Sequence, residues 1–372
     1  MKNALVRVKH QGNTGCLANR FLPAPMKTIY SDKHKLRNSA TELYGGQLVE
    51  PFERPSRAEF IINRVREENL GQVLDPHDHG IEPVYRVHDK DYVDFMQVAW
   101  EMWQAEKFAG EAIPTTWPAR RMSQRVPEFI ECKLGYYAMA AETSISEGTW
   151  EAAYWSAQVA LTGAAELRAA GLRAGDSGVF ALCRPPGHHS ALDMYGGYCF
   201  LNNAAIAAQS FLDNGADRVA IVDVDFHHGN GTQDIFYKRN DVLFVSLHGD
   251  PSDAFPHFLG YSDETGEGEG VGFNLNYPMK PATGFEEWRG ALADALGRVS
   301  KFAPDALVIS LGVDNFENDP ISFFKLKSDD FISYGKDISN LQLPTLFVME
   351  GGYDIDEIGI NTVNVLQGFT GA

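Results

Sequence analysis

Basic side chains and cysteines are scarce in this sequence. Its 32 Lys and Arg residues are outnumbered by 50 Asp and Glu residues, which gives a formal net charge of −18 at pH 7. A surface this acidic repels phosphate backbones and attracts cations, so we expect no nucleic acid partner and favour a small basic solute. The four cysteines are widely spaced, at Cys16, Cys132, Cys183 and Cys199. This spacing suggests neither a disulfide scaffold nor a zinc–thiolate site, and it fits a reducing cytoplasm.

Long hydrophobic runs are also missing. No stretch approaches the ~20 apolar residues that a membrane helix requires, and the N-terminal stretch lacks the apolar segment of a secretory signal. We therefore expect a cytoplasmic protein with no membrane partner.

Residues 1–25 carry four basic residues and no acid, unlike the rest of the chain. We expect them to form a peripheral extension of unknown role.

The remaining chain, residues 26–372, is long enough for a single large α/β domain, and 44% hydrophobic residues suffice for its core. After residue 150, short β-branched apolar runs such as RVAIVDVDF and DALVISLGVD alternate with helical patterns. This alternation predicts a central parallel β-sheet with helices on both faces. Residues 109–150 contain three prolines and predict a long functional loop that ends in a helix.

Polar clusters follow the predicted strands. Their sequences are CRPPGHHS, DVDFHHGNG, SLHGDP, LGVDNFEND and MEGGYD. Because ligands bind at the C-terminal ends of strands in open parallel sheets, we expect these loops to meet at one crevice.

Asp225, His227 and Asp314 are the candidate metal ligands in these clusters. If the strand continues through Asp225 and His227, both side chains face one cavity, because residues two apart on a strand point the same way. Two carboxylates and one imidazole leave a divalent ion with an open position for water. Such an oxygen-rich set suits Zn²⁺ or Fe²⁺. Taken alone, the Asp-x-His pair also fits a hydrogen-bonded strand end.

The tandem histidines and a tyrosine supply candidate acid–base groups. His188 or His189 beside a metal-bound water suits a general base, with Asp223 and Asn230 as orienting acceptors. A surface loop is the alternative interpretation of this pair. Tyr353 follows two glycines that permit a sharp backbone path, and its phenol is suited to hydrogen-bond a developing oxyanion. Alone, it also fits a turn tyrosine packed on the surface.

Taken in order, the motifs RPPGHHS, DVDFHHGNGTQDIFY, SLHGDP, LGVDNFENDP and EGGYD resemble the histone deacetylase superfamily. This resemblance implies the arginase-deacetylase fold. Further segments, including DKHKLRNSATELYGGQLVEPFERPSRAE, IECKLGYYAMAAETSIS, AFPHFLGY and DPISFFKL, resemble the bacterial acetylpolyamine amidohydrolases of that superfamily. The implied activity is metal-dependent removal of acetyl groups from acetylated polyamines. A protein or peptide acetyl-lysine deacetylase, or another small-molecule amidase, remains an alternative.

The resemblance also implies roles for single residues. The zinc ligands fall on Asp225, His227 and Asp314, and the catalytic residues on His188, His189 and Tyr353. His189 is then the general base and acid, His188 acts mainly through its charge, and Asp223 and Asn230 orient the pair. A structural K⁺ is implied near Asp223, Asp225, the His227 carbonyl and Ser246.

The remaining implied residues concern the substrate and the assembly. Tyr198 and Phe255 correspond to aromatics that line a narrow substrate channel, with ordinary core packing as the alternative. Glu131 and Glu142 correspond to acids that contact the polyamine, with solvated helix charges as the alternative. The segment 109–150 corresponds to an insertion that packs between two subunits and narrows the entrance, so a homodimer is expected.

Overall fold

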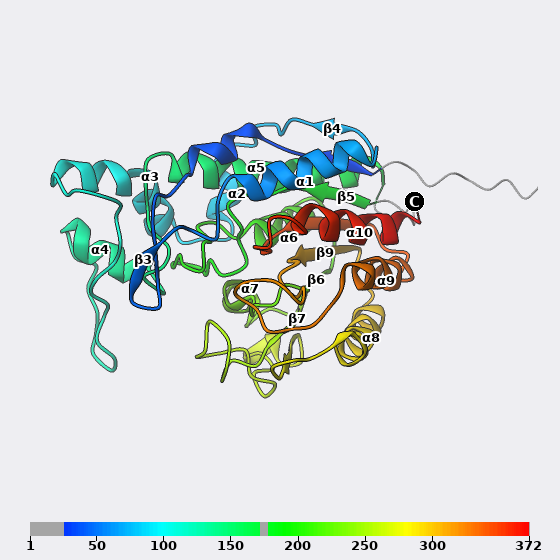
Figure 1. Cartoon of the computed structure of the whole chain (residues 1–372). Helices are drawn as coiled ribbons and strands as arrows, with labels where there is room; N and C mark the ends of the chain where they lie inside the picture. Colours follow the sequence, from blue (N-terminus) through cyan, green and yellow to red (C-terminus); the bar gives the residue numbers. More distant parts are fainter. Residues whose placement is uncertain (1–25, 172–177, 372) are drawn as a thin grey trace, which may run out of the picture.

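A sheet of eight parallel strands forms the centre of the molecule, as predicted (Figure 1). The structure is a computed structural model and describes residues 26–171 and 178–371. The strand order is β4-β1-β5-β10-β9-β6-β7-β8, and every neighbouring pair is parallel. The strands are β1 (Lys27–Ile29), β4 (Val73–Leu74), β5 (Gly178–Ala181), β6 (Val219–Asp223), β7 (Val242–Gly249), β8 (Asn274–Met279), β9 (Ala306–Leu311) and β10 (Thr345–Met349).

Helices follow most of these strands along the chain. They are α1 (Ser56–Glu67), α2 (Glu82–Tyr85), α3 (Lys90–Ala105), α4 (Ile130–Tyr137), α5 (Thr149–Ala169), α6 (Asn203–Asp213), α7 (Asn230–Phe236), α8 (Phe285–Phe302), α9 (Ser328–Ser339) and α10 (Ile358–Thr370). Two 3₁₀ turns, η1 (Asp32–Leu36) and η2 (Gly268–Gly270), and a separate antiparallel hairpin of β2 (Glu42–Tyr44) and β3 (Gln47–Val49) complete the described elements.

The two faces of the sheet form two separate hydrophobic cores, because successive side chains on a strand point to opposite faces. On β10, Leu346 and Val348 pack into the core that α3, α4, α5 and α6 cover. Phe347 and Met349 pack into the other core, covered by α1, α8, α9 and α10. The central strands β5, β6, β9 and β10 therefore need apolar residues at most positions, which explains the continuous apolar runs in the sequence.

The predicted strands are longer than the observed ones at the functional edge. β6 stops at Asp223 and β9 at Leu311, whereas the apolar patterns suggested continuation to Phe226 and Asp314. Beyond these ends, Asp225 Oδ2 accepts the Gly351 N–H and Asp314 Oδ1 accepts the Phe226 N–H, so both carboxylates are bound by neighbouring loops. The edge strands β4 and β8 and the β2–β3 hairpin were not predicted, because short or partly polar strands give little periodic signal.

The C-terminal strand ends face the left-hand side of Figure 1, where the β2–β3 hairpin and the 109–150 segment with α4 also lie. An antiparallel β-bridge between Ala112 and Ile145 joins the two ends of that segment. Each residue donates its N–H to the carbonyl oxygen of the other, with N···O distances of 2.9 Å. Within the described residues, every helix is too short or too polar to cross a membrane. The predicted extension, residues 1–25, lies outside the described residues.

Candidate active site

Two carboxylates and one imidazole meet beyond the C-terminal ends of β6 and β9. Asp225, His227 and Asp314 all lie in loops, so the assumption that the strand continues through His227 is wrong. The side chains converge nonetheless, because the loops turn toward each other. His227 Nδ1 lies 2.9 Å from Asp314 Oδ2 and 3.3 Å from Asp225 Oδ1.

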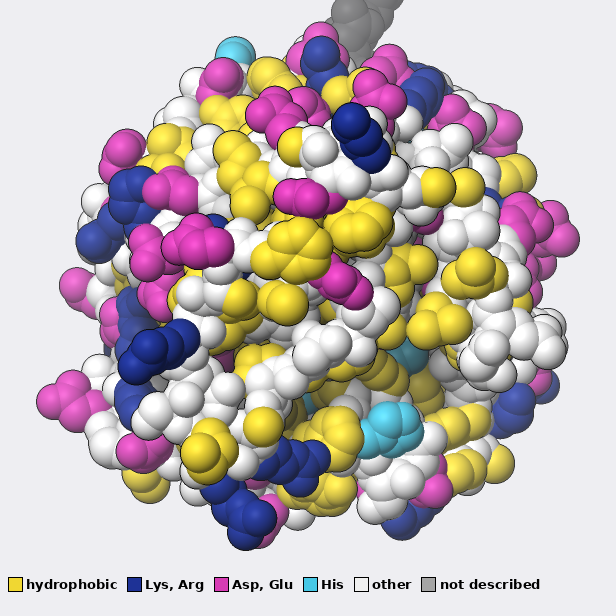
Figure 2. Space-filling view, turned by 90° about the vertical axis from the view of Figure 1, so that its left-hand side faces the viewer, with side chains coloured by type: hydrophobic (Ala, Val, Ile, Leu, Met, Phe, Trp, Pro, Cys, Tyr) yellow, Lys and Arg dark blue, Asp and Glu magenta, His cyan; other side chains and the backbone are white. Residues whose placement is uncertain are grey.

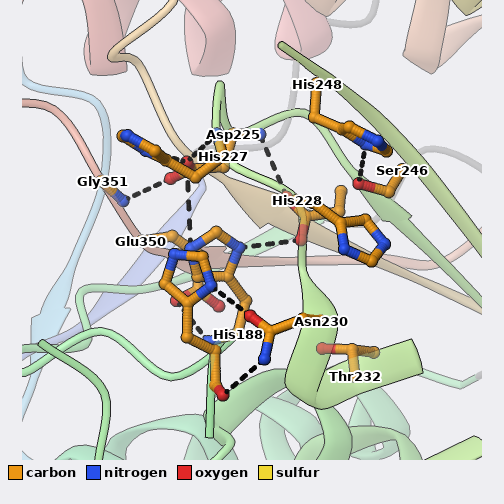
Figure 3. Close-up of polar contacts among 12 residues, drawn as sticks. His188, Asp225, His227, His228, Asn230, Thr232, Ser246, His248, Glu350 and Gly351 are labelled. Carbon is orange, nitrogen blue, oxygen red and sulfur yellow. Dashed lines mark hydrogen bonds and ion pairs between the residues drawn. The ribbon is translucent and has the colours of Figure 1, made fainter. Parts of the chain in front are cut away.

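The donor atoms of this triad fit a divalent metal ion. Asp225, His227 and Asp314 are buried, and each offers a ligand atom within 4.8 Å of the others. The second oxygen of each carboxylate is fixed, since Gly351 N–H donates to Asp225 Oδ2 (2.7 Å; Figure 3) and Phe226 N–H to Asp314 Oδ1 (2.8 Å). Burial and the charge of Asp225 raise the pKa of the Asp314 carboxyl. A cation between the two carboxylates would relieve this repulsion.

The tandem histidines stack beside the triad with their ring centroids 4.0 Å apart. His188 Nδ1 lies 2.9 Å from Asp223 Oδ2, and His189 Nδ1 lies 2.6 Å from Asn230 Oδ1. Both oxygens act as acceptors, so each Nδ1 carries a hydrogen. The charges of Asp225 and Asp223 outweigh burial and raise the pKa of His188 to about 10, so its ring is protonated. Burial, assisted by the charges of His188 and His227, holds the pKa of His189 well below its ordinary value. His189 is therefore a neutral imidazole that can accept a proton.

Tyr353 lies under a buried guanidinium group. The Arg57 side chain stacks 4.8 Å from the ring centroid and donates to the carbonyls of Gly352 and Glu350, both at 2.6 Å. The Tyr353 N–H donates to Asp319 Oδ2 at 2.8 Å. Burial raises the pKa of the phenol well above its ordinary value, although the charge of Arg57 opposes this shift. The phenol therefore stays protonated and available as a hydrogen-bond donor.

Arg57 belongs to a buried ionic cluster that the sequence analysis missed. Glu53 contacts Arg184 at 2.7 Å, Arg57 at 3.1 Å and Arg37 at 3.9 Å. Burial alone would raise the pKa of Glu53, but the three guanidinium charges outweigh burial and lower it. The available signal was weak, because Arg57 stands at a helix start where a basic residue is normally solvated. Arg184 opens the motif RPPGHHS, and Arg37, Glu53 and Arg57 lie in a segment that carries the family resemblance, but no pattern pairs them.

These groups lie at the bottom of a pocket of about 370 Å³. Figure 2 looks onto this side of the molecule and shows a hollow with histidine and hydrophobic atoms inside it. The residues that line the pocket are Glu42, Leu43, Tyr44, Gly45, Glu142, His189, Gly197, Tyr198, Phe226, His227, Asp253, Ala254, Phe255, His257, Ile321, Phe323 and Tyr353. The predicted channel aromatics, Tyr198 and Phe255, are thus both in its wall.

Tyr198 is held by acids from two distant segments. Its phenol donates to Glu42 Oε1 at 2.6 Å, and its N–H donates to Thr143 Oγ1 at 2.8 Å. Glu142 Oε1 accepts the neighbouring Gly197 N–H at 2.8 Å. The role of Glu42 was not anticipated, because an acid in an exposed hairpin sequence gives no sign of burial.

The two predicted polyamine contacts lie in different places. Glu142 lines the pocket, and its Oε1 is the oxygen that makes the hydrogen bonds to neighbouring groups. Glu131 begins the α4 helix, accepts a hydrogen bond from Thr115 Oγ1 at 3.0 Å and is not among the pocket residues of this chain. Of these two residues, the structure therefore brings only Glu142 to the pocket.

Of the groups expected to hold K⁺, Asp223 and Ser246 lie on adjacent strands, whereas Asp225 and the His227 carbonyl belong to the loop after β6. Asp223 of β6 pairs in register with Ser246 of β7. Ser246 Oγ lies 2.8 Å from His248 Nδ1, as Figure 3 shows, and His248 Nε2 lies 2.8 Å from the Gly260 carbonyl oxygen. This hydrogen-bonded chain connects the strands to the loop that follows Phe255.

A parallel sheet that carries an Asp–His–Asp triad, paired histidines and a tyrosine at its C-terminal edge is the arrangement of a metal-dependent hydrolase. The histone deacetylase domain family matches residues 51–369. The chain belongs to this histone deacetylase family, and its fold is the arginase-deacetylase fold.

Individual members of the family are similar in sequence to this chain over nearly its full length. The chain is 57% identical to the acetylpolyamine amidohydrolase of Mycoplana ramosa, covering 93% of this chain and 100% of that protein. It is 55% identical to acetylpolyamine amidohydrolase 1 of Pseudomonas aeruginosa, with 93% and 99% covered. The crystal structure of an acetylpolyamine aminohydrolase from Burkholderia pseudomallei superimposes with a TM-score of 0.87 at 39% identity, covering 92% of this chain and 98% of that chain.

Proposed function

We propose that this protein is a metal-dependent amidohydrolase that removes acetyl groups from acetylated polyamines, giving acetate and a free amine. The observation that carries this proposal is the pocket, which joins His189, His227 and Tyr353 to the carboxylates of Glu42 and Glu142. Identity of 55–57% to acetylpolyamine amidohydrolases supports the same substrate class.

Asp225, His227 and Asp314 would hold the metal ion, Zn²⁺ or Fe²⁺, which when bound polarises the amide carbonyl and lowers the pKa of a water molecule. His189 takes the proton of the attacking water at Nε2, because its Nδ1–H is committed to Asn230. The protonated His189 then delivers that proton to the leaving amine.

The other two polar groups of the site stabilise the charges that develop. The Tyr353 phenol donates a hydrogen bond to the tetrahedral oxyanion. His188, oriented by Asp223, contributes mainly through its charge. A structural K⁺ near Asp223, Asp225, the His227 carbonyl and Ser246 would add a fixed positive charge behind these residues.

Channel shape and charge select the substrate. Tyr198 and Phe255 admit an unbranched methylene chain, and Glu142 attracts a distal ammonium group. We propose that residues 26–372 form one domain, that 109–150 pack between two subunits, and that Glu131 reaches the polyamine only in this homodimer. The free thiols of Cys132, Cys183 and Cys199 fit a cytoplasmic enzyme.

A hydrolysis assay with the metal-loaded protein tests this function. Acetylputrescine, acetylcadaverine and acetylspermidine are compared with an acetyl-lysine peptide by kcat/KM. We expect the free polyamines to be preferred. The Tyr353→Phe variant, which loses the donor to the oxyanion, should lower kcat by about 10²–10³-fold.

Tyr277→Phe serves as the matched control, because that phenol bonds Asp294 and is not among the pocket residues. It should retain the activity of the unmodified protein. Preference for the peptide would instead indicate an open entrance and a protein deacetylase. Full activity in Tyr353→Phe would refute the assignment of the oxyanion donor.

A further inference from the structure

A second cluster of metal-ligating side chains lies beside the catalytic residues. His188, Cys199 and Glu350 are buried, and one ligand atom of each lies within 4.8 Å of the others. None of the three is a pocket-lining residue, and neither Cys199 nor Glu350 takes part in the mechanism above. Their proximity depends on tertiary structure, since they come from the loops after β5 and β10.

An unpartnered carboxylate oxygen in this cluster indicates that the cluster binds a cation. Glu350 Oε2 accepts the N–H groups of Gly187 (2.6 Å) and His188 (3.2 Å), whereas the buried Oε1 has no hydrogen-bond partner among the described residues. A buried carboxylate oxygen without a partner is costly and therefore requires an explanation. Figure 3 shows Glu350 beside the His188 ring.

His188 and Cys199 supply the other two metal ligands, an imidazole and a thiolate. The Nδ1–H of His188 is fixed by Asp223, an arrangement that in metal sites orients the ring and presents Nε2 to the ion. Cys199 Sγ lies 3.3 Å from the Gly197 carbonyl oxygen, a weak contact for a thiol. Thiolate, imidazole and carboxylate together favour Zn²⁺ or a softer divalent ion over Mg²⁺ or Ca²⁺.

We propose that His188, Cys199 and Glu350 form a second, inhibitory site for a soft divalent cation, distinct from the Asp225–His227–Asp314 triad. Binding releases two protons to solvent, the thiol proton of Cys199 and the Nε2 proton that gives His188 its charge, and it forms bonds to Sγ, His188 Nε2 and Glu350 Oε1. The bound charge lies next to the His188–His189 pair, whose ring centroids are 4.0 Å apart. It opposes the positive charge that His189 acquires during proton transfer, so turnover falls.

Cobalt titration of the metal-free full chain tests the site without relying on activity. A thiolate bound to Co²⁺ gives a near-ultraviolet charge-transfer band, whereas the oxygen and nitrogen ligands of the triad give none. We expect two Co²⁺ ions per chain and a thiolate band that accompanies one of them. The band should disappear in Cys199→Ser and persist in Cys183→Ser, a matched buried thiol outside the cluster. Both variants are titrated in a background that carries Cys16→Ser and Cys132→Ser, because Cys132 is exposed and Cys16 is the fourth thiol of the sequence.

Activity provides the second readout, with each protein normalised to its own rate at one equivalent of metal. A second equivalent should lower turnover by about tenfold or more in the unmodified chain, and should have no effect in Cys199→Ser. Absence of the thiolate band, its survival in Cys199→Ser, or unchanged turnover at full occupancy would each overturn the proposal. If no amide is hydrolysed at all, the proposed function fails while the cobalt band still decides the site.

Discussion

Arg57 connects the loop that carries Tyr353 to the buried acid Glu53. Its guanidinium group satisfies two backbone carbonyls of the Glu-Gly-Gly-Tyr turn and stacks on the phenol ring. At the scale of single residues, the orientation of the oxyanion donor thus depends on a side chain almost 300 positions away in sequence. Arg57 is a positioning residue, because it acts on the reaction only through Tyr353.

Replacing Arg57 with Met keeps the side-chain length and removes its charge and donors. We expect kcat to fall by about 10²-fold, as for loss of an oxyanion donor, with a smaller change in KM because the channel wall is intact. Denaturant unfolding should show a loss of about 3–5 kcal/mol, since a buried ion pair is broken. Arg57→Lys should recover part of kcat, and Arg54→Met, at the partly exposed neighbour paired with Glu50, should change neither quantity. Unchanged kcat in Arg57→Met would contradict this role.

His88 makes stability depend on pH. Burial lowers its pKa from 6.5 to about 4, and its ring bonds the Ala191 carbonyl oxygen and the Asn202 N–H. The unfolded chain therefore binds a proton more readily than the folded one. The contribution of neutral His88 is complete above pH 6.5 and is lost as the pH falls toward 4, a change of about 3 kcal/mol.

The His88→Gln variant tests this dependence by denaturant unfolding at several pH values. It should be less stable than the unmodified protein at pH 7, and the difference should shrink as the pH falls from 6.5 to 4. The surface variant His77→Gln should follow the unmodified protein at every pH. A difference for His88→Gln that stays constant with pH would show that proton binding is not involved.

At the scale of elements, the 109–150 segment and the β2–β3 hairpin both reach the pocket. The segment supplies Glu142, and the hairpin supplies Glu42, Leu43, Tyr44 and Gly45. The segment also exposes large apolar side chains to solvent: Trp117, Met122, Val126 and Phe129. Exposed apolar side chains gathered on one segment are typical of a contact surface, which supports the proposed homodimer.

Charged substitutions on this segment should weaken the dimer. Each apolar side chain buried in an interface contributes about 1.5–3 kcal/mol, so Met122→Glu with Val126→Glu should raise the dissociation constant by at least about 100-fold. Sedimentation velocity over a concentration series measures the effect. Val271→Glu, at an exposed apolar position elsewhere in the chain, should leave the dimer intact. An unmodified protein that sediments as a monomer at micromolar concentration would refute the proposal.

At the scale of the whole molecule, the net charge of −18 acts on every cationic substrate that approaches the pocket. Salt screens such long-range attraction, with a Debye length of about 10 Å at 0.1 M and about 3 Å at 1 M ionic strength. The hydrogen-bonded groups at the bottom of the pocket are buried and are screened much less.

Raising the ionic strength should therefore increase KM and leave kcat nearly unchanged. The effect should be several-fold for acetylspermidine, smaller for acetylputrescine, which carries one ammonium fewer, and absent for uncharged N-butylacetamide. Steady-state kinetics between about 0.01 M and 0.5 M salt measure it. Equal KM increases for all three compounds would show that charge attraction does not contribute to recognition.

The polar clusters after the predicted strands contain the triad, the histidine pair and Tyr353, and the structure brings these clusters together at one edge of the sheet. Asp223 and Asn230, the predicted partners of the histidines, lie 2.9 Å and 2.6 Å from the Nδ1 atoms of His188 and His189. Arg57, Glu53 and Glu42 were missed. All three lie in the segment DKHKLRNSATELYGGQLVEPFERPSRAE, which carries the family resemblance but gives no sign of their individual roles. Their partners Tyr198, Arg184 and Tyr353 lie more than 100 residues away.

The sequence by itself determined the local features: the apolar strands, the helices between them, and the polar residues that each strand delivers to one edge of the sheet. These follow from periodicity and from the chirality of parallel strand connections. Only the tertiary structure decided which loops meet. It brings Asp225 to Asp314, Arg57 to Tyr353, and Cys199 to Glu350. The physical reason is that such contacts depend on packing between elements distant in sequence, which no local pattern of residues records.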